Sequence, residues 1–494
     1  MRNPLPPVPG KLLEIEVSDD LRRGTPLATL IVAPSEEDGD AVLEEIGGVR
    51  PTGKAGDVQT VPTGDVRWLA GVGDGEPRHY RKAGAALVRA VSSALGDDVK
   101  AGLKAFRTFA VELPADAGAE HVEELAFGLL LGGYRFTVTA DEPKPSVRTV
   151  RLLTRHERAV PAYDKALERV RELAAAAAFA RDLANAPSNI KTPAWLADTV
   201  VATARAKGGL PNLTVSVRDE KWLAAEGFGG VLAVGGGSAA PPRLIELEYR
   251  PRGATTHLLL VGKGITFDTG GLSIKPADGM HLMRTDMAGG AAIIAAVRAI
   301  AALRLPVRVT ALVPAAENHV SGSSYRPGDI VRHYGGKTTE VGNTDAEGRM
   351  VLADALVYGI KKHKPDVVID AATLTGAMKV SLGVRTGGVF ATEDALAERV
   401  TKAGERVGEA WWRMPLLEDL AETVQGSLGD VRQAPGGPGG IVAALFLREF
   451  VGDVPWVHLD IAGPARADKT YEDVVPGATG FAARTLVELV ASYA

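Results

Sequence analysis

Short apolar runs alternate with segments of helical spacing in the first part of the chain. Strands are predicted at Leu12–Val17, Leu27–Val32 and Val66–Ala70. Helices are predicted at Arg81–Leu95 and Ala119–Leu131, where apolar residues recur every three or four positions. This alternation predicts a smaller α/β domain over residues 1–155. The acidic segment Ser35–Asp40 inside it is interpreted as a solvated loop.

A different pattern follows over residues 156–190. Tyr163–Leu183 is rich in Ala, Arg and Glu, and Ala is the strongest helix former. The segment Asn185–Asn189 comes next and is rich in turn residues. We therefore predict a long helix that links two domains.

Strand and helix patterns alternate more strongly over residues 191–494. Continuous apolar runs predict strands at Leu258–Val261, Val307–Val313, Val367–Asp370 and Trp456–Ile461. Helices are predicted at Ala288–Leu303, Gly348–Lys362, Asp394–Gly408, Gly440–Phe450 and Phe481–Ser492. Strands that are apolar throughout indicate a sheet covered on both faces. The fold class is therefore α/β, with a larger second domain built on a central mixed sheet flanked by helices.

Composition narrows the classes of protein that remain. The chain has 494 residues, 46% of them apolar, and a net charge of −5, which argues against nucleic acid as a partner. There is no cysteine, so neither a disulfide nor a thiolate ligand can form. The N-terminus carries no apolar run of the signal-peptide type, and the longest apolar stretches fall short of a membrane span. We expect no membrane partner and a cytoplasmic location.

The segment Leu258–Pro276, LLLVGKGITFDTGGLSIKP, is the most informative one. A predicted buried strand ends there and a glycine-rich loop follows. Ligands of open α/β sheets bind beyond the carboxyl ends of the strands. The loop places Lys263, Asp268 and Lys275 at such an end.

Two familiar glycine loops do not match this segment. A phosphate-binding P-loop fails because His257 stands where its first Gly belongs and Gly264 follows Lys263. A dinucleotide-binding fingerprint fails because Phe267 stands at the place of its third Gly.

Two further segments carry carboxylates. Asp286 precedes a predicted Ala-rich helix, where an Asp is also a common N-cap. Asp345, Glu347 and Arg349 alternate just before another predicted helix, so in an extended backbone they share one face. Helix capping with solvated charges is the alternative for these residues as well.

Taken together, Asp268, Asp286, Asp345 and Glu347 bring four negative charges, which two divalent cations would balance. Two cations about 3.5–4 Å apart are a recurrent device of hydrolases. Lys263 would be an unusual ligand because it has to be neutral, and nearby cations lower the pKa of an ammonium group. The residues alone therefore predict a metal-dependent hydrolase.

At these residues the sequence resembles the leucine aminopeptidase, or cytosol aminopeptidase, family. The motifs VGKGITFDTGGLSIKP, MRTDMAGGAA, NTDAEGRMVLADAL and DAATLTGA occur in the family's order, and the resemblance extends from Asn185 to the C-terminus. It implies an aminopeptidase that acts on peptides, with two Mn²⁺ or Zn²⁺ ions per subunit in a homohexamer.

The resemblance also implies roles for individual residues. Asp268 and Glu347 would bridge the two metals, Lys263 and Asp286 would complete one site, and Asp345 the other. Lys275 and Arg349 would be catalytic, with a bicarbonate held at Arg349 as the base. The implied substrate-binding positions are Met283, Thr373, Leu374 and Gly376, and the apolar Met would favour leucine and similar residues.

Two other functions stay open at this point. A two-metal phosphoesterase would use the same carboxylates but usually more His ligands, and the chain has nine His. An aminopeptidase scaffold that also binds DNA is the other alternative, and the acidic balance does not favour it.

Overall fold

The computed structural model describes residues 5–34, 43–139, 146–205 and 209–494. The chain divides into two compact units, residues 1–175 with 468–476, and residues 176–467 with 477–494. The division falls inside helix α3 (Val160–Asn185). The predicted limits 1–155, 156–190 and 191–494 stay a prediction. The acidic segment Ser35–Asp40 lies outside the described residues.

The first unit is a six-stranded sheet with strand order β1-β6-β5-β2-β4-β3. Its strands are β1 (Glu14–Ser18), β2 (Leu27–Ile31), β3 (Val58–Thr60), β4 (Val66–Gly71), β5 (Thr108–Glu112) and β6 (Thr149–Leu153). Neighbouring strands are parallel except β3 and β4. Helices α1 (Pro77–Lys100) and α2 (Ala119–Gly132) pack closely against each other, and a Cβ at Gly128 would clash with the Arg81 carbonyl oxygen. The predicted α/β pattern is confirmed here.

The second unit is built on a nine-stranded mixed sheet with strand order β16-β15-β18-β14-β9-β11-β8-β7, and β10 pairs with β11 beside this path. The strands are β7 (Leu213–Arg218), β8 (Arg243–Tyr249), β9 (His257–Gly262), β10 (Gly264–Asp268), β11 (Arg308–Asn318), β14 (Val367–Ala372), β15 (Thr386–Ala391), β16 (Ala410–Arg413) and β18 (Trp456–Asp460). Strands β11, β9, β14 and β18 run parallel. Their carboxyl ends therefore meet at one edge of the sheet.

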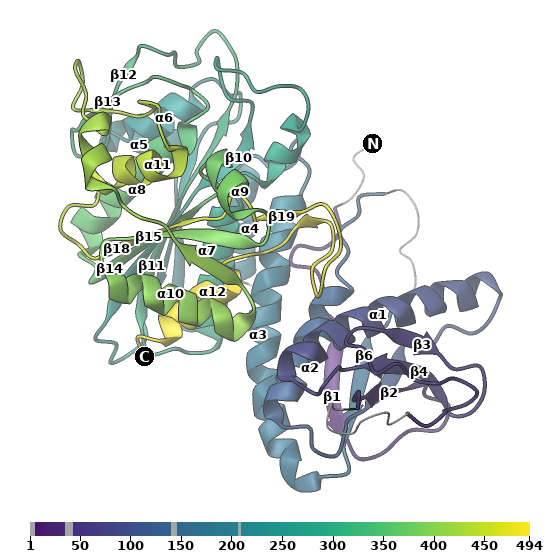
Figure 1. Cartoon of the computed structure of the whole chain (residues 1–494). Helices are drawn as coiled ribbons and strands as arrows, with labels where there is room; N and C mark the ends of the chain where they lie inside the picture. Colours follow the sequence, from purple (N-terminus) through teal and green to yellow (C-terminus); the bar gives the residue numbers. More distant parts are fainter. Residues whose placement is uncertain (1–4, 35–42, 140–145, 206–208) are drawn as a thin grey trace. The chain divides into compact units, whose positions relative to one another are not determined.

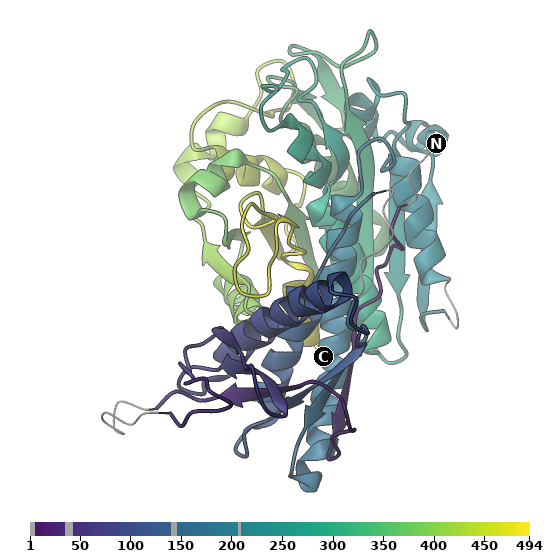
Figure 2. The ribbon, with the colours of Figure 1, turned by 90° about the vertical axis from the view of Figure 1, so that its right-hand side faces the viewer.

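Helices cover both faces of this sheet, as predicted. In Figure 1, α7 (Ala288–Ala302), α10 (Asp394–Val407) and α12 (Ala483–Ala491) lie together on one side. The other side holds α5 (Glu220–Glu226), α6 (Gly229–Gly235), α8 (Glu347–His363) and α11 (Gly439–Arg448). The layers can be followed from a second direction in Figure 2. The central strands are buried from both faces, and every residue of β9 and of β14 is buried.

The remaining described elements are short or lie at the edges of this unit. The helices are α4 (Pro193–Ala204), α9 (Gly376–Leu382) and the 3₁₀ turns η3 (Met280–Thr285) and η4 (Glu418–Val424). A small sheet joins β12 (Ile330–Arg332), β13 (Thr338–Glu340) and β17 (Val431–Arg432), and β19 (Arg466–Ala467) pairs with β20 (Gly477–Ala478). In the first unit, η2 (Glu157–Ala159) precedes α3.

One described helical segment, Met280–Ala302, has the length and apolar composition of a membrane span. It joins η3 to α7, which is why it is longer than the predicted helix. Most of it, 89% of its apolar window, is buried inside the structure. This is the burial expected of a core helix.

Candidate active site

The site begins at the ends of two strands that are consecutive in the chain, β9 and β10. Lys263 lies between β9 and β10, and Asp268 is the last residue of β10. The Lys263 backbone is fixed from both sides, because its N–H donates to the Ala371 carbonyl at 3.0 Å and its own carbonyl accepts from the Gly290 N–H at 2.8 Å. A Cβ at Gly348 would lie 2.6 Å from Cε of Lys263, so glycine is needed where α8 approaches this side chain.

Lys263 is buried and surrounded by carboxylates from two other segments. Its Nζ lies 2.9 Å from both carboxylate oxygens of Asp286 and 2.8 Å from Oε1 of Glu347. It also donates to the Thr373 carbonyl at 2.9 Å. The glycine-rich loop and the two carboxylate segments, far apart in sequence, therefore meet at this lysine.

Lys275 joins the remaining carboxylates. Its Nζ is 2.8 Å from Oδ2 of Asp268 and forms a close ion pair with Asp345. The other oxygen of Asp268, Oδ1, accepts from the Gly270 N–H and from the Asn318 side chain, each at 2.8 Å. The five predicted metal ligands and Lys275 thus lie in one cluster.

The capping alternative can now be tested against this geometry. Helix α7 has Met287 at its N-cap and no side-chain cap, and the carboxylate of Asp286 instead accepts from Lys263 and from the Thr373 hydroxyl. Helix α8 has Ala346 at its N-cap, also without a side-chain cap. The carboxylates of Asp286, Asp345 and Glu347 are therefore directed into the cluster and not at helix ends.

Burial and neighbouring negative charges make it unfavourable for these carboxylates to be ionised. Burial, together with the charge of Asp268, raises the pKa of Glu347 to about 8. Burial also raises the pKa of Asp286 and of Asp345. For Lys263, burial favours the neutral amine, but the charges of Asp286 and Glu347 outweigh it and raise the pKa. The cluster attracts positive charge strongly.

The donor set fits divalent cations. One carboxylate oxygen from each of Asp268, Asp286 and Glu347 can be chosen so that all three lie within 4.8 Å of one another, and all three residues are buried. Oδ2 of Asp286, Oδ1 of Asp345 and Oε1 of Glu347 lie at ion-pair distance from the lysines, yet none accepts a well-directed hydrogen bond. Buried carboxylate oxygens without directed donors are suited to metal coordination.

The comparisons with known proteins agree with this site. The sequence model described as "Cytosol aminopeptidase family, catalytic domain" matches residues 178–487. The chain belongs to the cytosol aminopeptidase family. It is thus a metal-dependent aminopeptidase, a hydrolase whose substrates are peptides. This removes the phosphoesterase alternative.

Individual relatives cover most of the chain. A "Probable cytosol aminopeptidase" of Micrococcus luteus is 44% identical over 449 residues, 85% of this chain and 84% of that protein. One of Roseiflexus castenholzii is 47% identical over 368 residues, 73% of this chain and 74% of that protein. Among solved structures, the bottromycin maturation enzyme BotP in complex with Mn is similar, with a TM-score of 0.80 and 38% identity over 94% of this chain and 98% of that one.

Arg349 of this aminopeptidase lies on the first turn of α8 and is buried. Its Nη1 donates to the Gln433 carbonyl at 2.5 Å, whereas its Nε has no hydrogen-bond partner among the described residues. Burial lowers the pKa of Arg349 to about 10, although the nearby charges of Glu347 and Asp460 oppose the shift. An unpaired guanidinium N–H is suited to an oxyanion.

Of the four predicted substrate-binding positions, Thr373 contacts the cluster. Thr373 and Leu374 follow β14 and are half-buried, and Gly376 is exposed at the start of α9. Thr373 contacts the cluster directly, since its hydroxyl donates to Oδ1 of Asp286 at 2.8 Å. Met283 lies in η3, one turn before Asp286, and is half-buried.

The sequence did not single out the residues that hold the acidic cluster in place. Asn318, at the end of β11, donates to Asp268 and to the Thr344 carbonyl. Tyr325 donates to the same Thr344 carbonyl at 2.8 Å. Neither residue gave a clear sequence signal, because the predicted strand Val307–Val313 ends five residues before Asn318, whereas β11 extends to Asn318 itself. The two His near the motifs are outside the cluster. His281 is exposed, and His257, at the start of β9, forms a hydrogen bond with the Thr310 hydroxyl.

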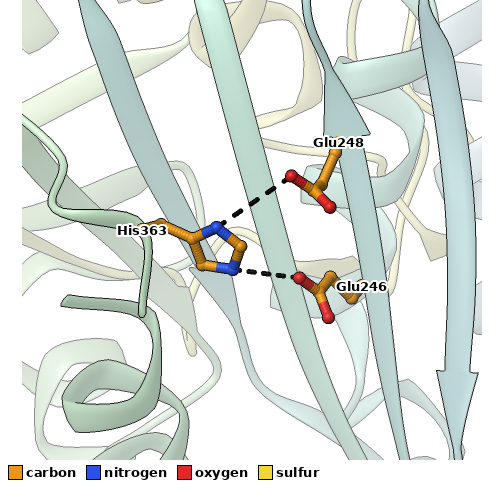
Figure 3. Close-up of side chains that lie close together, drawn as sticks. All are labelled: Glu246, Glu248 and His363. Carbon is orange, nitrogen blue, oxygen red and sulfur yellow. Dashed lines mark ion pairs between the residues drawn. The ribbon is translucent and has the colours of Figure 1, made fainter. Parts of the chain in front are cut away.

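A second group with metal-ligand chemistry lies elsewhere in the large unit and consists of Glu246 and Glu248 on β8 and His363 at the end of α8 (Figure 3). The two ring nitrogens of His363 face different carboxylates, Nε2 at 2.9 Å from Glu246 and Nδ1 at 4.0 Å from Glu248. Lys362 pairs with Glu246 at 3.0 Å, and Arg250 pairs with Glu248. Cations of the chain already pair with both carboxylates, so this group is an ion-pair network.

Proposed function

We propose that this aminopeptidase binds two divalent cations, Mn²⁺ or Zn²⁺, and releases N-terminal leucine and other apolar residues from peptides. Asp268 and Glu347 would bridge the two ions. Lys263 and Asp286 would complete one site, and the side chain and backbone carbonyl of Asp345 the other. The observation that carries the proposal is the set of buried carboxylate oxygens without directed hydrogen bonds.

The charge of the cluster supports the binding of divalent cations. The cluster contains four carboxylates and two lysines, so its formal charge is −2 when all six groups are ionised. Lys263 can bind a metal only as the neutral amine, so its Nζ has to give up a proton. The similar BotP structure is a complex with Mn, which supports ions of this kind.

Two bound divalent cations supply an activated water as the nucleophile at neutral pH. Lys275 has a separate role. Its ammonium pairs with Asp268 and Asp345 here, and it would be free to face the substrate when those carboxylates hold metal. It would then donate to the oxygen of the scissile carbonyl, where negative charge develops during attack.

Arg349 would bind a bicarbonate that accepts the proton from the water. The unpaired Nε and the deep burial of the guanidinium support this role. Burial strengthens the attraction of an anion, because little water competes with the hydrogen bonds.

Selectivity for the N-terminus would follow from the bound cations. A free α-amine is a ligand for a divalent cation, whereas an acylated nitrogen is not. Met283, Thr373, Leu374 and Gly376 would line the pocket for the first side chain, and the apolar Met283 favours leucine. We further propose a homohexamer in the cytoplasm, in keeping with the word "cytosol" in the names of the relatives.

Metal content tests the bridging roles. Asp268→Asn and Glu347→Gln should each lower the content of both ions and abolish hydrolysis of leucinamide. Asp354→Asn is the matched control, because Asp354 is a fully buried carboxylate on α8 that binds the Val231 and Tyr334 N–H groups instead. Full metal content with normal turnover in both site variants would exclude bridging.

A further inference from the structure

Asp460 is a buried carboxylate that no role in the proposed chemistry yet uses. It is the last residue of β18 and is 1% exposed. Its Oδ1 accepts from the N–H groups of Leu374 and Ala462, each at 3.1 Å. Its Oδ2 accepts from the Thr375 N–H at 3.1 Å and from the Thr375 hydroxyl at 2.8 Å. Both carboxylate oxygens are therefore fully engaged.

Three of these four hydrogen bonds hold the segment 373–375, which leads from β14 into the candidate active site. In the sheet, Asp460 is the partner of Ala372, so its side chain reaches the residues that directly follow β14. The Thr375 hydroxyl is committed to Asp460, and accordingly α9 has no side-chain N-cap. A carboxylate suits this position because it offers two acceptor oxygens and no donor.

The segment 373–375 also connects Asp460 to Lys263. The Leu374 N–H and the Thr373 carbonyl belong to one planar peptide group. Asp460 accepts from the N–H of that plane, and the carbonyl of the same plane accepts from Nζ of Lys263 at 2.9 Å. The orientation of one side of the plane therefore sets the orientation of the other.

Thr373 extends the connection to a second proposed ligand. Its hydroxyl donates to Oδ1 of Asp286 at 2.8 Å and lies 3.1 Å from the Asp286 carbonyl. A change in the backbone of Thr373 would therefore disturb both Lys263 and Asp286, the two residues proposed to complete one metal site.

We propose that Asp460 is a positioning residue of the aminopeptidase, which fixes the 373–374 peptide plane and thereby aligns Lys263, Asp286 and the substrate-facing segment 373–376. The inference rests on the proposed metal and substrate roles of those residues. Asp460 contacts neither the proposed metals nor the substrate, and it acts through the segment that does.

The substitution Asp460→Asn tests this role with little change in shape. It keeps one acceptor oxygen and replaces the other by an NH2 group. That group faces either the Leu374 N–H or the Thr375 N–H and cannot accept from it, so the hold on the segment 373–375 is weakened in either orientation. The variant should bind Mn²⁺ about 10–100-fold more weakly in calorimetric titration, and its kcat/KM on leucinamide should fall by a similar factor. The rise in KM should account for part of the loss, because the segment 373–376 also faces the substrate.

Asp354→Asn is again the matched control, because Asp354 also accepts main-chain N–H groups in the interior, away from the segment 373–376. It should lower the melting temperature but leave Mn²⁺ affinity and kcat/KM near wild type. If Asp460→Asn folds and keeps both quantities within twofold of wild type, or if the two variants lose them equally, Asp460 has no positioning role.

Thr375→Val gives a second test should Asp460→Asn fail to fold. It removes one of the four hydrogen bonds and should shift Mn²⁺ affinity and KM in the same direction by about threefold, a smaller share of the same effect. Unchanged values in that variant would overturn the proposal. Wild-type protein without activity on leucinamide would instead contradict the proposed function, and the Mn²⁺ titration would still judge Asp460.

Discussion

Replacing Lys263 by Met should destabilise the metal-free protein far more than the metal-bound one. Met keeps most of the length of the side chain and removes its charge. The side chains of Lys263, Asp286 and Glu347 are 4%, 8% and 1% exposed, so the variant leaves two buried carboxylates without their cation. The Thr373 carbonyl also loses a hydrogen bond.

Breaking a buried ion pair by removing one partner costs about 3–5 kcal/mol. At about 2 °C per kcal/mol for a large domain, the melting temperature should fall by about 6–10 °C. The lower end is the better expectation, because the pKa of Glu347 is already raised to about 8 and this carboxyl can take up a proton in the variant.

The assay is thermal unfolding of wild type and variant, each in chelator and in excess Mn²⁺. Bound Mn²⁺ should supply the missing charge, so the difference between the two proteins should shrink when metal is added. Lys337→Met is the control, because Lys337 forms a half-exposed ion pair with Glu449 and should cost at most about 1 kcal/mol with or without metal. A Lys263 variant as stable as wild type in chelator would refute the reasoning.

Three further predictions address the substrate, the oxyanion and the second ion-pair network. Acetylation of the substrate's α-amine should abolish cleavage, and equal rates on blocked and free peptides in a competition assay would indicate an endopeptidase. Lys275→Ala should retain its metal by elemental analysis but lose about 10²–10³-fold in kcat, and near-normal turnover would remove Lys275 from the mechanism. Burial by itself would raise the pKa of Glu246, but His363 and Lys362 outweigh it and lower this pKa from 4.5 to about 2. The ionised Glu246 therefore contributes about 3 kcal/mol to the free energy of unfolding above pH 4.5, and this contribution is lost as the pH falls towards 2. The stability difference between wild type and Glu246→Gln, measured by unfolding from pH 7 to pH 2, should shrink over that interval, and a constant difference would contradict the assignment.

The sequence predicted the main strands of the large unit and the carboxylates of the site, because both leave local signals. Apolar runs such as Leu258–Val261 have few alternatives to a buried strand. Lys263 follows that run by two residues, so its place at a strand end could be inferred without knowing the sheet order. Asp268 was predicted in the loop, but it is the last residue of β10, a strand that the sequence did not predict.

Other features depend on contacts between distant segments and leave no local pattern. Asn318 reaches Asp268 only because β10 pairs with β11, and Asp460 reaches Thr375 only because β18 lies beside β14. The edge strands β7 and β16 are short or partly exposed, so their residues lack a continuous apolar run. The assignment of residues 468–476 to the first unit likewise rests on contacts and not on composition.

Titration of chelator-treated wild-type protein with Mn²⁺ or Zn²⁺, followed by both metal content and leucinamide hydrolysis, tests the two-metal site most directly. We predict negligible hydrolysis in the stripped protein and full activity on binding of about two equivalents of metal per chain. Full activity in the stripped protein, or saturation of activity at one equivalent with the second never bound, would contradict the two-metal site.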